Sequence, residues 1–454
     1  MVNSESPRFI AGVVEGFYGP PWSPTERGEL FDTLAAGELN TYLYAPKDDL
    51  KHRAIWREVY TAEEAATLTA LIQGCTSRGL NFIYAVSPGL DIRYSDLAEL
   101  ERLHARIAQM LSAGCEHFAL LFDDIPDRMH LADREAFGSF AAAQSHVATA
   151  LFRWLRERSP AARFLFCPTP YCGRMAERKL GGENYLATIG RELPPEIDVL
   201  WTGPEIISRE VTVEHVREMR RVLQRKPLLW DNLHANDYDG HRFFCGPYAG
   251  RTPELRKEIA GVLLNPNCEF PLNFVPLRTF AAIVRESGAW DARAAYLAAM
   301  SEWLPRFVTV SGAVSLADLV LLGDCYYLPH EEGPEADAFF RRAAELLTAV
   351  PSTWGEEAAA FLVECARLRE LCGRLAELRD RPLFYALSRR IWELREELDL
   401  LERYVTARSE NKSSNAAPRS DFHLPGTYRG GLVAKLQRLL TPRADGSFTP
   451  LSAP

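Results

Sequence analysis

Short apolar runs alternate with longer amphipathic stretches over roughly the first 266 residues of the chain. Eight apolar runs can be recognised, and they begin near Phe9, Thr41, Phe82, His117, Arg163, Ile197, Pro227 and Gly261. Their spacing of roughly 30 to 46 residues is what one strand and its crossover helix require. Strands that alternate with helices in this way predict a parallel sheet. Eight such units in somewhat under 300 residues predict a closed (β/α)8 barrel.

Helix start signals support this interpretation. Ser23, Pro24 and Glu26 provide an N-cap serine, a proline at the first helical position and a capping-box glutamate. Thr61 and Glu64 repeat the pattern. Apolar residues at helical spacing follow each signal, so these segments predict helices that coat the barrel.

Helical periodicity replaces the strand pattern after about residue 290. The apolar positions follow steps of three and four residues, as in packed helices. They are Phe339, Ala343, Leu346 and Val350, then Ala358, Phe361, Cys365, Leu368, Cys372 and Leu375, and finally Phe384, Leu387, Ile391, Leu394, Leu398 and Leu401. We therefore expect the barrel over residues 8–290 and an α-helical bundle over 291–408. Residues 409–454 are mostly polar, with one amphipathic piece from Leu432 to Leu440, and predict a mobile tail.

Composition and charge exclude several classes of protein. Hydrophobic residues make up 47% of the chain and charged residues 25%, which is typical of a globular protein. The net charge of −9 does not favour binding to nucleic acid or to a membrane surface. Nine cysteines without a CxxC pair argue against a disulfide framework and a zinc ribbon. Because the chain shows neither a signal-peptide pattern nor a long apolar stretch, we expect a cytoplasmic location.

Two adjacent carboxylates stand at the end of a predicted strand. Asp123 and Asp124 directly follow the apolar residues 118–122, and barrel active sites are built at the carboxyl ends of strands. Two carboxylates so close cannot both ionise cheaply, so we expect one anion and one acid near neutral pH. That pair suits acid–base catalysis at an acetal. A turn that caps the next helix and a divalent-metal site are the alternatives.

Other strand ends carry the residue types of a sugar pocket. Aromatic rings stack on the apolar faces of a pyranose, and amides bind its hydroxyl groups. Trp230, Asn232, Asp237 and Asn265 fit this requirement. A metal site would need further converging carboxylates or histidines, and His234 has no second histidine at a strand end. We therefore expect neither a metal nor a cofactor.

Six segments along the barrel resemble the motifs of glycoside hydrolase family 84, the O-GlcNAcase family. They lie in order between about residues 8 and 290, and are GVVEGFYGPPW (12–22), LNTYLYAPKDD (39–49), FALLFDDI (118–125), WTGP (201–204), WDNLHANDYD (230–239) and LNPNCEF (264–270). The resemblance implies a retaining exo-β-N-acetylglucosaminidase that removes O-linked GlcNAc from Ser or Thr of proteins or peptides. In such an enzyme the 2-acetamido oxygen of the substrate attacks the anomeric carbon and forms an oxazoline.

The resemblance also implies a role for each matching residue. Asp123 would orient and deprotonate the acetamido N–H, and Asp124 would act first as general acid and then as general base. The implied substrate-binding residues are Gly16 and Lys47 for the 3-hydroxyl region, Tyr171 for the acetamido oxygen, Trp230 and Asn232 for the acetamido pocket, Asp237 and Asn265 for the 4- and 6-hydroxyls, and Tyr18 and Thr202 nearby.

Residues that hold the terminal sugar do not contact what lies beyond the scissile oxygen. A hexosaminidase or hyaluronidase-like enzyme acting on GlcNAc-containing glycans therefore stays an alternative. A non-catalytic carbohydrate-binding barrel is another, although the intact Asp123–Asp124 pair argues against it. The expected partners are GlcNAc-modified proteins, peptides or glycans. The helical region could cover an acceptor groove or mediate self-association as a homodimer.

Overall fold

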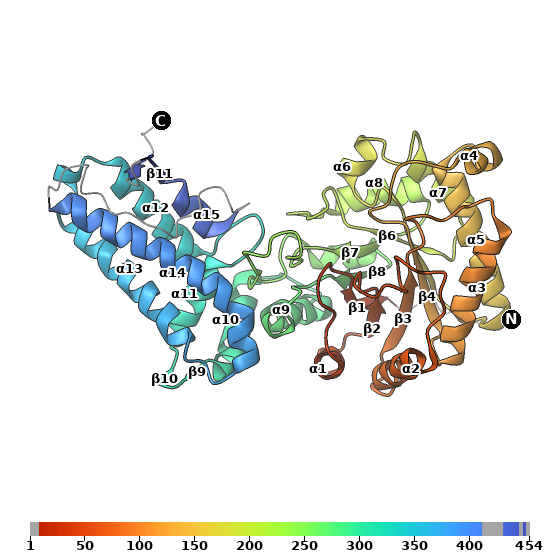
Figure 1. Cartoon of the computed structure of the whole chain (residues 1–454), viewed down its shortest axis with the longest axis horizontal. Helices are drawn as coiled ribbons and strands as arrows, with labels where there is room; N and C mark the ends of the chain where they lie inside the picture. The colour runs from red at the N-terminus through yellow and green to blue at the C-terminus, as the bar shows by residue number, and fades with distance from the viewer. Residues whose placement is uncertain (1–8, 411–429, 445–447, 451–454) are drawn as a thin grey trace. The chain divides into compact units, whose positions relative to one another are not determined.

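The computed structural model describes residues 9–410, 430–444 and 448–450. These residues form two compact units (Figure 1). The first comprises the chain up to Asp237 together with Tyr248–Cys268 and Phe280–Trp290. The second comprises Tyr238–Pro247, Glu269–Thr279 and the chain from Asp291 onward. In the described part of the chain, every helix falls short of the length and apolar character that a membrane span requires.

The first unit is a closed barrel of eight parallel strands. These are β1 (Ile10–Glu15), β2 (Thr41–Tyr44), β3 (Asn81–Val86), β4 (His117–Leu121), β5 (Phe164–Cys167), β6 (Asp198–Trp201), β7 (Leu228–Asp231) and β8 (Gly261–Leu264). Strands that follow one another in the chain are paired, and β8 closes the barrel by pairing with β1. The predicted (β/α)8 barrel is confirmed, and each strand begins within one residue of its predicted start.

Helices coat the barrel, and the first two begin directly after the predicted N-cap residues Ser23 and Thr61. They are α1 (Pro24–Ala36), α2 (Ala62–Thr76), α3 (Leu97–Ser112), α4 (Leu131–Phe137), α5 (Phe140–Arg158), α6 (Gly173–Glu177), α7 (Tyr185–Glu192) and α8 (Val213–Leu223). Both capping boxes form, one between Ser23 and Glu26 and the other between Thr61 and Glu64. Each box satisfies backbone N–H groups that the first helical turn leaves unpaired.

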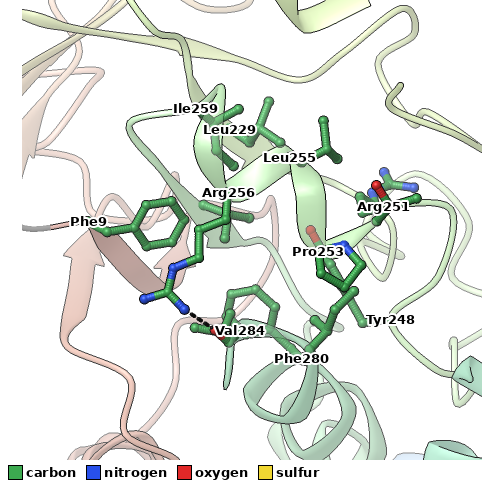
Figure 2. A pocket seen from close by; sticks show the side chains of 13 residues that line it. Phe9, Leu229, Tyr248, Arg251, Pro253, Leu255, Arg256, Ile259, Phe280 and Val284 are labelled. Carbon is green, nitrogen blue, oxygen red and sulfur yellow. Dashed lines mark hydrogen bonds between the residues drawn. The ribbon is translucent and has the colours of Figure 1, made fainter. Parts of the chain in front are cut away.

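The coat is thinnest between β7 and β8. Only a short 3-10 helix, η1 (Pro253–Lys257), connects these strands, and α9 (Phe274–Arg285) follows β8. An apolar pocket opens there on the outer face of the barrel, with Leu229, Val262 and Phe280 in its lining (Figure 2). Arg256 reaches across it and donates a hydrogen bond to the carbonyl oxygen of Val284 at 2.6 Å. This pocket contains none of the candidate site residues.

The second unit is mainly helical. Its helices are α10 (Ala292–Trp303), α11 (Leu316–Cys325), α12 (Pro334–Thr348), α13 (Gly355–Leu375), α14 (Arg381–Ser409) and α15 (Gly431–Gln437). Its smaller elements are η2 (Phe270–Leu272), η3 (Leu304–Arg306), η4 (Pro351–Thr353) and the strand pairs β9 (Val308–Thr309) with β10 (Gly312–Ala313) and β11 (Leu440–Pro442) with β12 (Phe448–Pro450). The two longest helices, α13 and α14, pack side by side (Figure 1).

The predicted apolar positions of α13 are all buried, and those of α14 are buried except Phe384. Phe384 is half-buried because the neighbouring Leu383 takes the inward position. The prediction for Val350 is wrong, since this side chain is 65% exposed. The reason is that α12 ends at Thr348, so the helical spacing no longer applies two residues later.

The predicted tail is described in part. Residues 411–429, 445–447 and 451–454 of it lie outside the described residues. Between the first two of these segments, α15 packs against α12 and α14, with Leu432, Val433 and Leu436 buried. Lys435 on the same helix forms an ion pair with Glu332. The apolar face of α15 is therefore part of the helical core, and the mobility of residues 409–454 stays a prediction.

Candidate active site

The candidate residues gather at the carboxyl ends of the barrel strands. Gly16 and Tyr18 follow β1, Lys47 follows β2, and the aspartate pair follows β4. The other candidates lie at or after the ends of β5 to β8, and are Tyr171, Thr202, Trp230, Asn232, Asp237 and Asn265. All of them belong to the barrel unit. Below them, alternate strand residues such as Val14, Leu43 and Leu121 fill the barrel interior with apolar side chains.

Asp123 is a buried anion. Only 7% of the residue is exposed, and Lys47 Nζ donates to its Oδ2 at 2.6 Å. Burial opposes ionisation, but the charges of Lys47 and Arg53 outweigh it and hold the pKa of Asp123 below its usual value. Its second oxygen, Oδ1, is buried and has no hydrogen-bond partner within the described part of the chain. Asp123 therefore keeps one acceptor for a hydrogen bond that the described residues do not supply.

Asp124 has a different environment, although it is the next residue. It is exposed, and its φ of 48° lies in the left-handed region. The hydroxyl of Tyr171 donates to its Oδ1 at 2.8 Å, and the hydroxyl of Tyr18 donates to its Oδ2 at 3.2 Å. Burial and the nearby charge of Asp124 raise the pKa of both phenols, which therefore stay protonated and remain donors.

The helix-cap alternative for the aspartate pair is wrong. The next helix, α4, begins at Leu131, and its N-cap residue is His130 rather than either aspartate. The backbone turn at Asp124 instead sends the two carboxylates to different partners.

Trp230 forms one wall of the site and is fixed on two sides. A Cβ on Gly16 would lie 2.3 Å from Cζ2 of this indole, so only glycine allows the ring to pack there. The indole Nε1 donates to Asn232 Oδ1 at 3.0 Å, and Asn265 Nδ2 donates to the same oxygen at 2.9 Å. Lys47 Nζ lies 5.8 Å from the centre of the Trp230 ring. Asn265 Oδ1 is buried and lacks a hydrogen-bond partner among the described residues.

Two of the candidates support their neighbours. Asp237 Oδ2 accepts a hydrogen bond from the backbone N–H of Tyr18 at 2.9 Å, which joins the loop after β7 to the loop after β1. The hydroxyl of Thr202 donates to the carbonyl oxygen of Glu205 at 2.9 Å. The backbone N–H of Thr202 donates to the carbonyl oxygen of Tyr171 at 2.9 Å. The structure thus gives Thr202 a role in holding the Tyr171 loop.

Two other strand-end carboxylates are turned away from the site. Glu15 is fully buried, and Arg27 Nη2 donates to its Oε1 at 2.7 Å. The guanidinium group of Arg251 donates one hydrogen bond to each carboxylate oxygen of Asp231, both at 2.7 Å. Such bidentate pairs fix the loops but leave no carboxylate free for chemistry.

The sequence interpretation missed two residues of the loop between β2 and α2. Arg53 donates to the backbone carbonyl oxygens of Asp123 at 3.2 Å and of Asp124 at 2.7 Å. His52 is fully buried, and its Nδ1 donates to the carbonyl oxygen of Ala85 at 2.8 Å. Burial and the charge of Lys47 lower the pKa of His52 to about 4. Both residues stand in the polar run after Lys47, where the sequence offers no mark that separates a site residue from a surface residue.

The donor set does not fit a metal ion. Among the described residues, no group of three or more His, Cys, Asp and Glu side chains could hold one. The carboxylate of Asp123 is instead neutralised by Lys47 at 2.6 Å and by Arg53 at 3.9 Å. These two cations would repel a divalent cation at the same place.

Comparisons with known proteins show what the chain is similar to. A family model described as beta-N-acetylglucosaminidase matches residues 11–314. The chain is 50% identical over 274 residues to the Protein O-GlcNAcase of Rattus norvegicus and to that of Mus musculus. Each match covers 60% of this chain but 30% of the relative, so the chain spans less than a third of these curated relatives. A solved mutant of the Thermobaculum terrenum O-GlcNAc hydrolase superimposes with a TM-score of 0.78 at 30% identity, and the match covers 88% of this chain and 85% of that one.

Proposed function

Because the chain belongs to the beta-N-acetylglucosaminidase family, we propose that it is a retaining exo-β-N-acetylglucosaminidase that removes O-linked GlcNAc from Ser or Thr of proteins or peptides. One observation carries the proposal: Asp123 is a buried anion paired with Lys47, whereas Asp124 is an exposed carboxylate held by two tyrosine hydroxyls. Two neighbouring carboxylates in such unlike environments can divide the roles of base and acid.

The first chemical step uses the substrate's own acetamido group. As the acetamido oxygen bonds to the anomeric carbon, Asp123 takes up the proton of the acetamido N–H through Oδ1. Asp124, protonated, gives its proton to the departing oxygen while the glycosidic bond breaks. In the second step Asp124 removes a proton from water, and the water oxygen bonds to the anomeric carbon while the C–O bond of the oxazoline breaks. Asp123 returns its proton to the nitrogen, so the acetamido group and the original anomeric configuration are restored. No enzyme side chain forms a covalent bond to the sugar.

The site has to rearrange when substrate enters. Tyr171 donates to Asp124 in this structure, and it would turn to the acetamido oxygen of the substrate. Trp230 and Asn232 would enclose the acetamido methyl group. The unpartnered Oδ1 of Asn265, together with Asp237, would accept hydrogen bonds from the 4- and 6-hydroxyls. Lys47 and the backbone at Gly16 would bind the 3-hydroxyl region.

The test compares two classes of substrate with the purified protein. O-GlcNAc-modified peptides and β-linked GlcNAc oligosaccharides are incubated side by side, and released GlcNAc is followed by proton NMR. We expect release from the peptides with the β-anomer formed first. Faster release from the oligosaccharides would favour the glycan-directed alternative. Binding of GlcNAc without any release would favour the non-catalytic barrel.

Self-association through the helical unit and a cytoplasmic location are further parts of this proposal. Tyr385 and Trp392 support the first, because they lie seven residues apart on α14 and are 67% and 58% exposed. Residues at this spacing share one face of a helix, and exposed aromatic side chains are common in interfaces. Light scattering coupled to size-exclusion chromatography should give the mass of a dimer for the wild type. The double variant with Tyr385→Ser and Trp392→Ser should have the mass of a monomer.

A further inference from the structure

The guanidinium group of Arg53 binds the main chain of both aspartates. Nη1 donates to the carbonyl oxygen of Asp123 at 3.2 Å, and Nη2 donates to that of Asp124 at 2.7 Å. A third hydrogen bond, from Nη1 to Ser87 Oγ at 3.0 Å, orients the group from the end of β3. The side chain is 8% exposed, so water does not compete for these contacts. Arg53 thus bridges two consecutive peptide units with one rigid, planar group.

These two peptide units contain the unusual turn of the site. Asp124 has a φ of 48°, a conformation that residues other than glycine rarely adopt and that persists only when surrounding structure fixes it. Hydrogen bonds to the carbonyl groups on both sides of its α-carbon supply that restraint. Lysine could not do the same, because one ammonium group lacks the planar fork that reaches two oxygens at once.

The turn decides where the carboxylate of Asp124 lies. Its oxygens reach the hydroxyls of Tyr171 and Tyr18, whereas Asp123 faces Lys47. A relaxed backbone would move the Asp124 carboxylate away from the tyrosines. A misplacement of about 1 Å can cost roughly 100-fold in rate. The contacts that would hold the sugar come from other strands, so they should depend less on this turn.

We propose that Arg53 is a positioning residue that holds the left-handed turn at Asp124 and so places the general acid at the leaving group. The inference rests on the proposed function and deepens it. Arg53 binds the backbone of the two aspartates at 3.2 and 2.7 Å, whereas it lies 3.9 Å from the carboxylate of Asp123. Arg53→Lys keeps the positive charge beside Asp123 but not the planar fork, so this variant tests the positioning role by itself. Loss of the fork should impair proton delivery more than sugar binding.

The experiment compares Arg53→Lys and Arg53→Ala with the wild type on two substrates. An O-GlcNAc peptide needs a proton for its leaving group, whereas a nitrophenyl glycoside does not. In pre-steady-state kinetics of Arg53→Lys we expect the rate of the glycosylation step on the peptide to fall about 10- to 100-fold, with KM changed less than about threefold and the rate of the same step on the nitrophenyl glycoside nearly kept. Arg53→Ala also loses the charge beside Asp123, so it should slow this step on both substrates, and on the peptide more. Added guanidinium ion at millimolar concentration should restore part of the peptide activity of Arg53→Ala, and ammonium ion should not.

The matched control is Arg57→Ala, on the same loop. Arg57 pairs with Glu99 and Asp91 and has no hydrogen bond to the aspartate pair. Any change in rate that Arg57→Ala causes should therefore be the same for both substrates. Equal losses in the rate of the glycosylation step on both substrates in folded Arg53→Lys, shown by an unchanged circular dichroism spectrum, would overturn the inference alone. If Arg53→Ala does not fold, the ratio of the rates that Arg53→Lys shows on the two substrates decides between these outcomes. A wild type inactive on both substrates would overturn the proposed function and the inference with it.

Discussion

At the scale of single residues, replacement of Asp123 and replacement of Asp124 should have different effects on the rate of hydrolysis. Asp124→Asn should slow an O-GlcNAc peptide by about 10² to 10⁴-fold, the usual contribution of a general acid, and spare the glycosylation step of a nitrophenyl glycoside. Asp123→Asn should slow the hydrolysis of both substrates, because in the proposed mechanism every substrate uses the acetamido nucleophile that Asp123 supports. Pre-steady-state kinetics on the two substrates separates these outcomes. A glycosyl-aspartate trapped by mass spectrometry would contradict the assigned roles.

The sequence could predict the position of these aspartates but not the contacts that make them differ. A fully apolar strand followed by two acids marks a barrel strand end, and the motifs around Lys47, Trp230 and Asn265 mark the others. The backbone angle at Asp124 could not be predicted, because an aspartate carries no requirement for a left-handed turn. Arg53 could not be found either, since its partners lie about 70 residues away and are backbone atoms.

His52 should make the barrel sensitive to acid. Its pKa is about 4 in the folded chain and near 6.5 when unfolded, so the folded state favours the neutral imidazole. Below pH 6.5 the unfolded chain binds a proton at His52 that the folded chain does not bind. The contribution of His52 to the free energy of unfolding is therefore complete above pH 6.5 and is lost as the pH falls to 4. The loss amounts to roughly 3 kcal/mol.

His52→Asn retains a side-chain N–H donor for the carbonyl oxygen of Ala85 but cannot titrate. Thermal melts at pH 7 and pH 4.5 should therefore differ less for this variant than for the wild type. The exposed His130 provides the control, and His130→Asn should keep the wild-type difference. An unchanged pH dependence in His52→Asn would show that other groups control the acid sensitivity.

At the scale of elements, α15 should stabilise the helical unit. Leu436 is fully buried between this helix and its neighbours α12 and α14. Leu436→Ala should cost roughly 2 to 5 kcal/mol, as large-to-small core substitutions do. Urea unfolding followed by the circular dichroism of the helices would measure the change. The exposed Val363→Ala on α13 is the matched control and should cost far less. Equal effects of the two variants would contradict the packed position of α15.

Element boundaries could be predicted where a local signal exists. The capping boxes at Ser23 and Thr61 depend on residues three apart, and both form. No such signal marks the end of α12, so periodicity alone extended the helix to Val350. Nor could a polar composition around residue 430 show that a short apolar face would find a partner on distant helices.

At the scale of the whole molecule, activity should not depend on a metal ion. Lys47 and Arg53 already neutralise Asp123. In the proposed mechanism, proton transfer with acetamido participation takes the place of a Lewis acid. Dialysis against a chelator should therefore leave the rate of GlcNAc release unchanged. A loss of activity that a divalent cation restores would refute both the assigned chemistry and the interpretation of the aspartate pair.

The pairing of β1 with β8 has a consequence for synthesis of the chain. Ile10 lies opposite Gly261, so the partner of the first strand is translated roughly 250 residues later. At about 5 to 20 residues per second this interval lasts roughly 10 to 50 seconds. Throughout it, one edge of β1 exposes unpaired backbone groups that any other extended chain could bind. We therefore expect that a chaperone or the early helices of the chain cover this edge of β1 until the ribosome delivers β8.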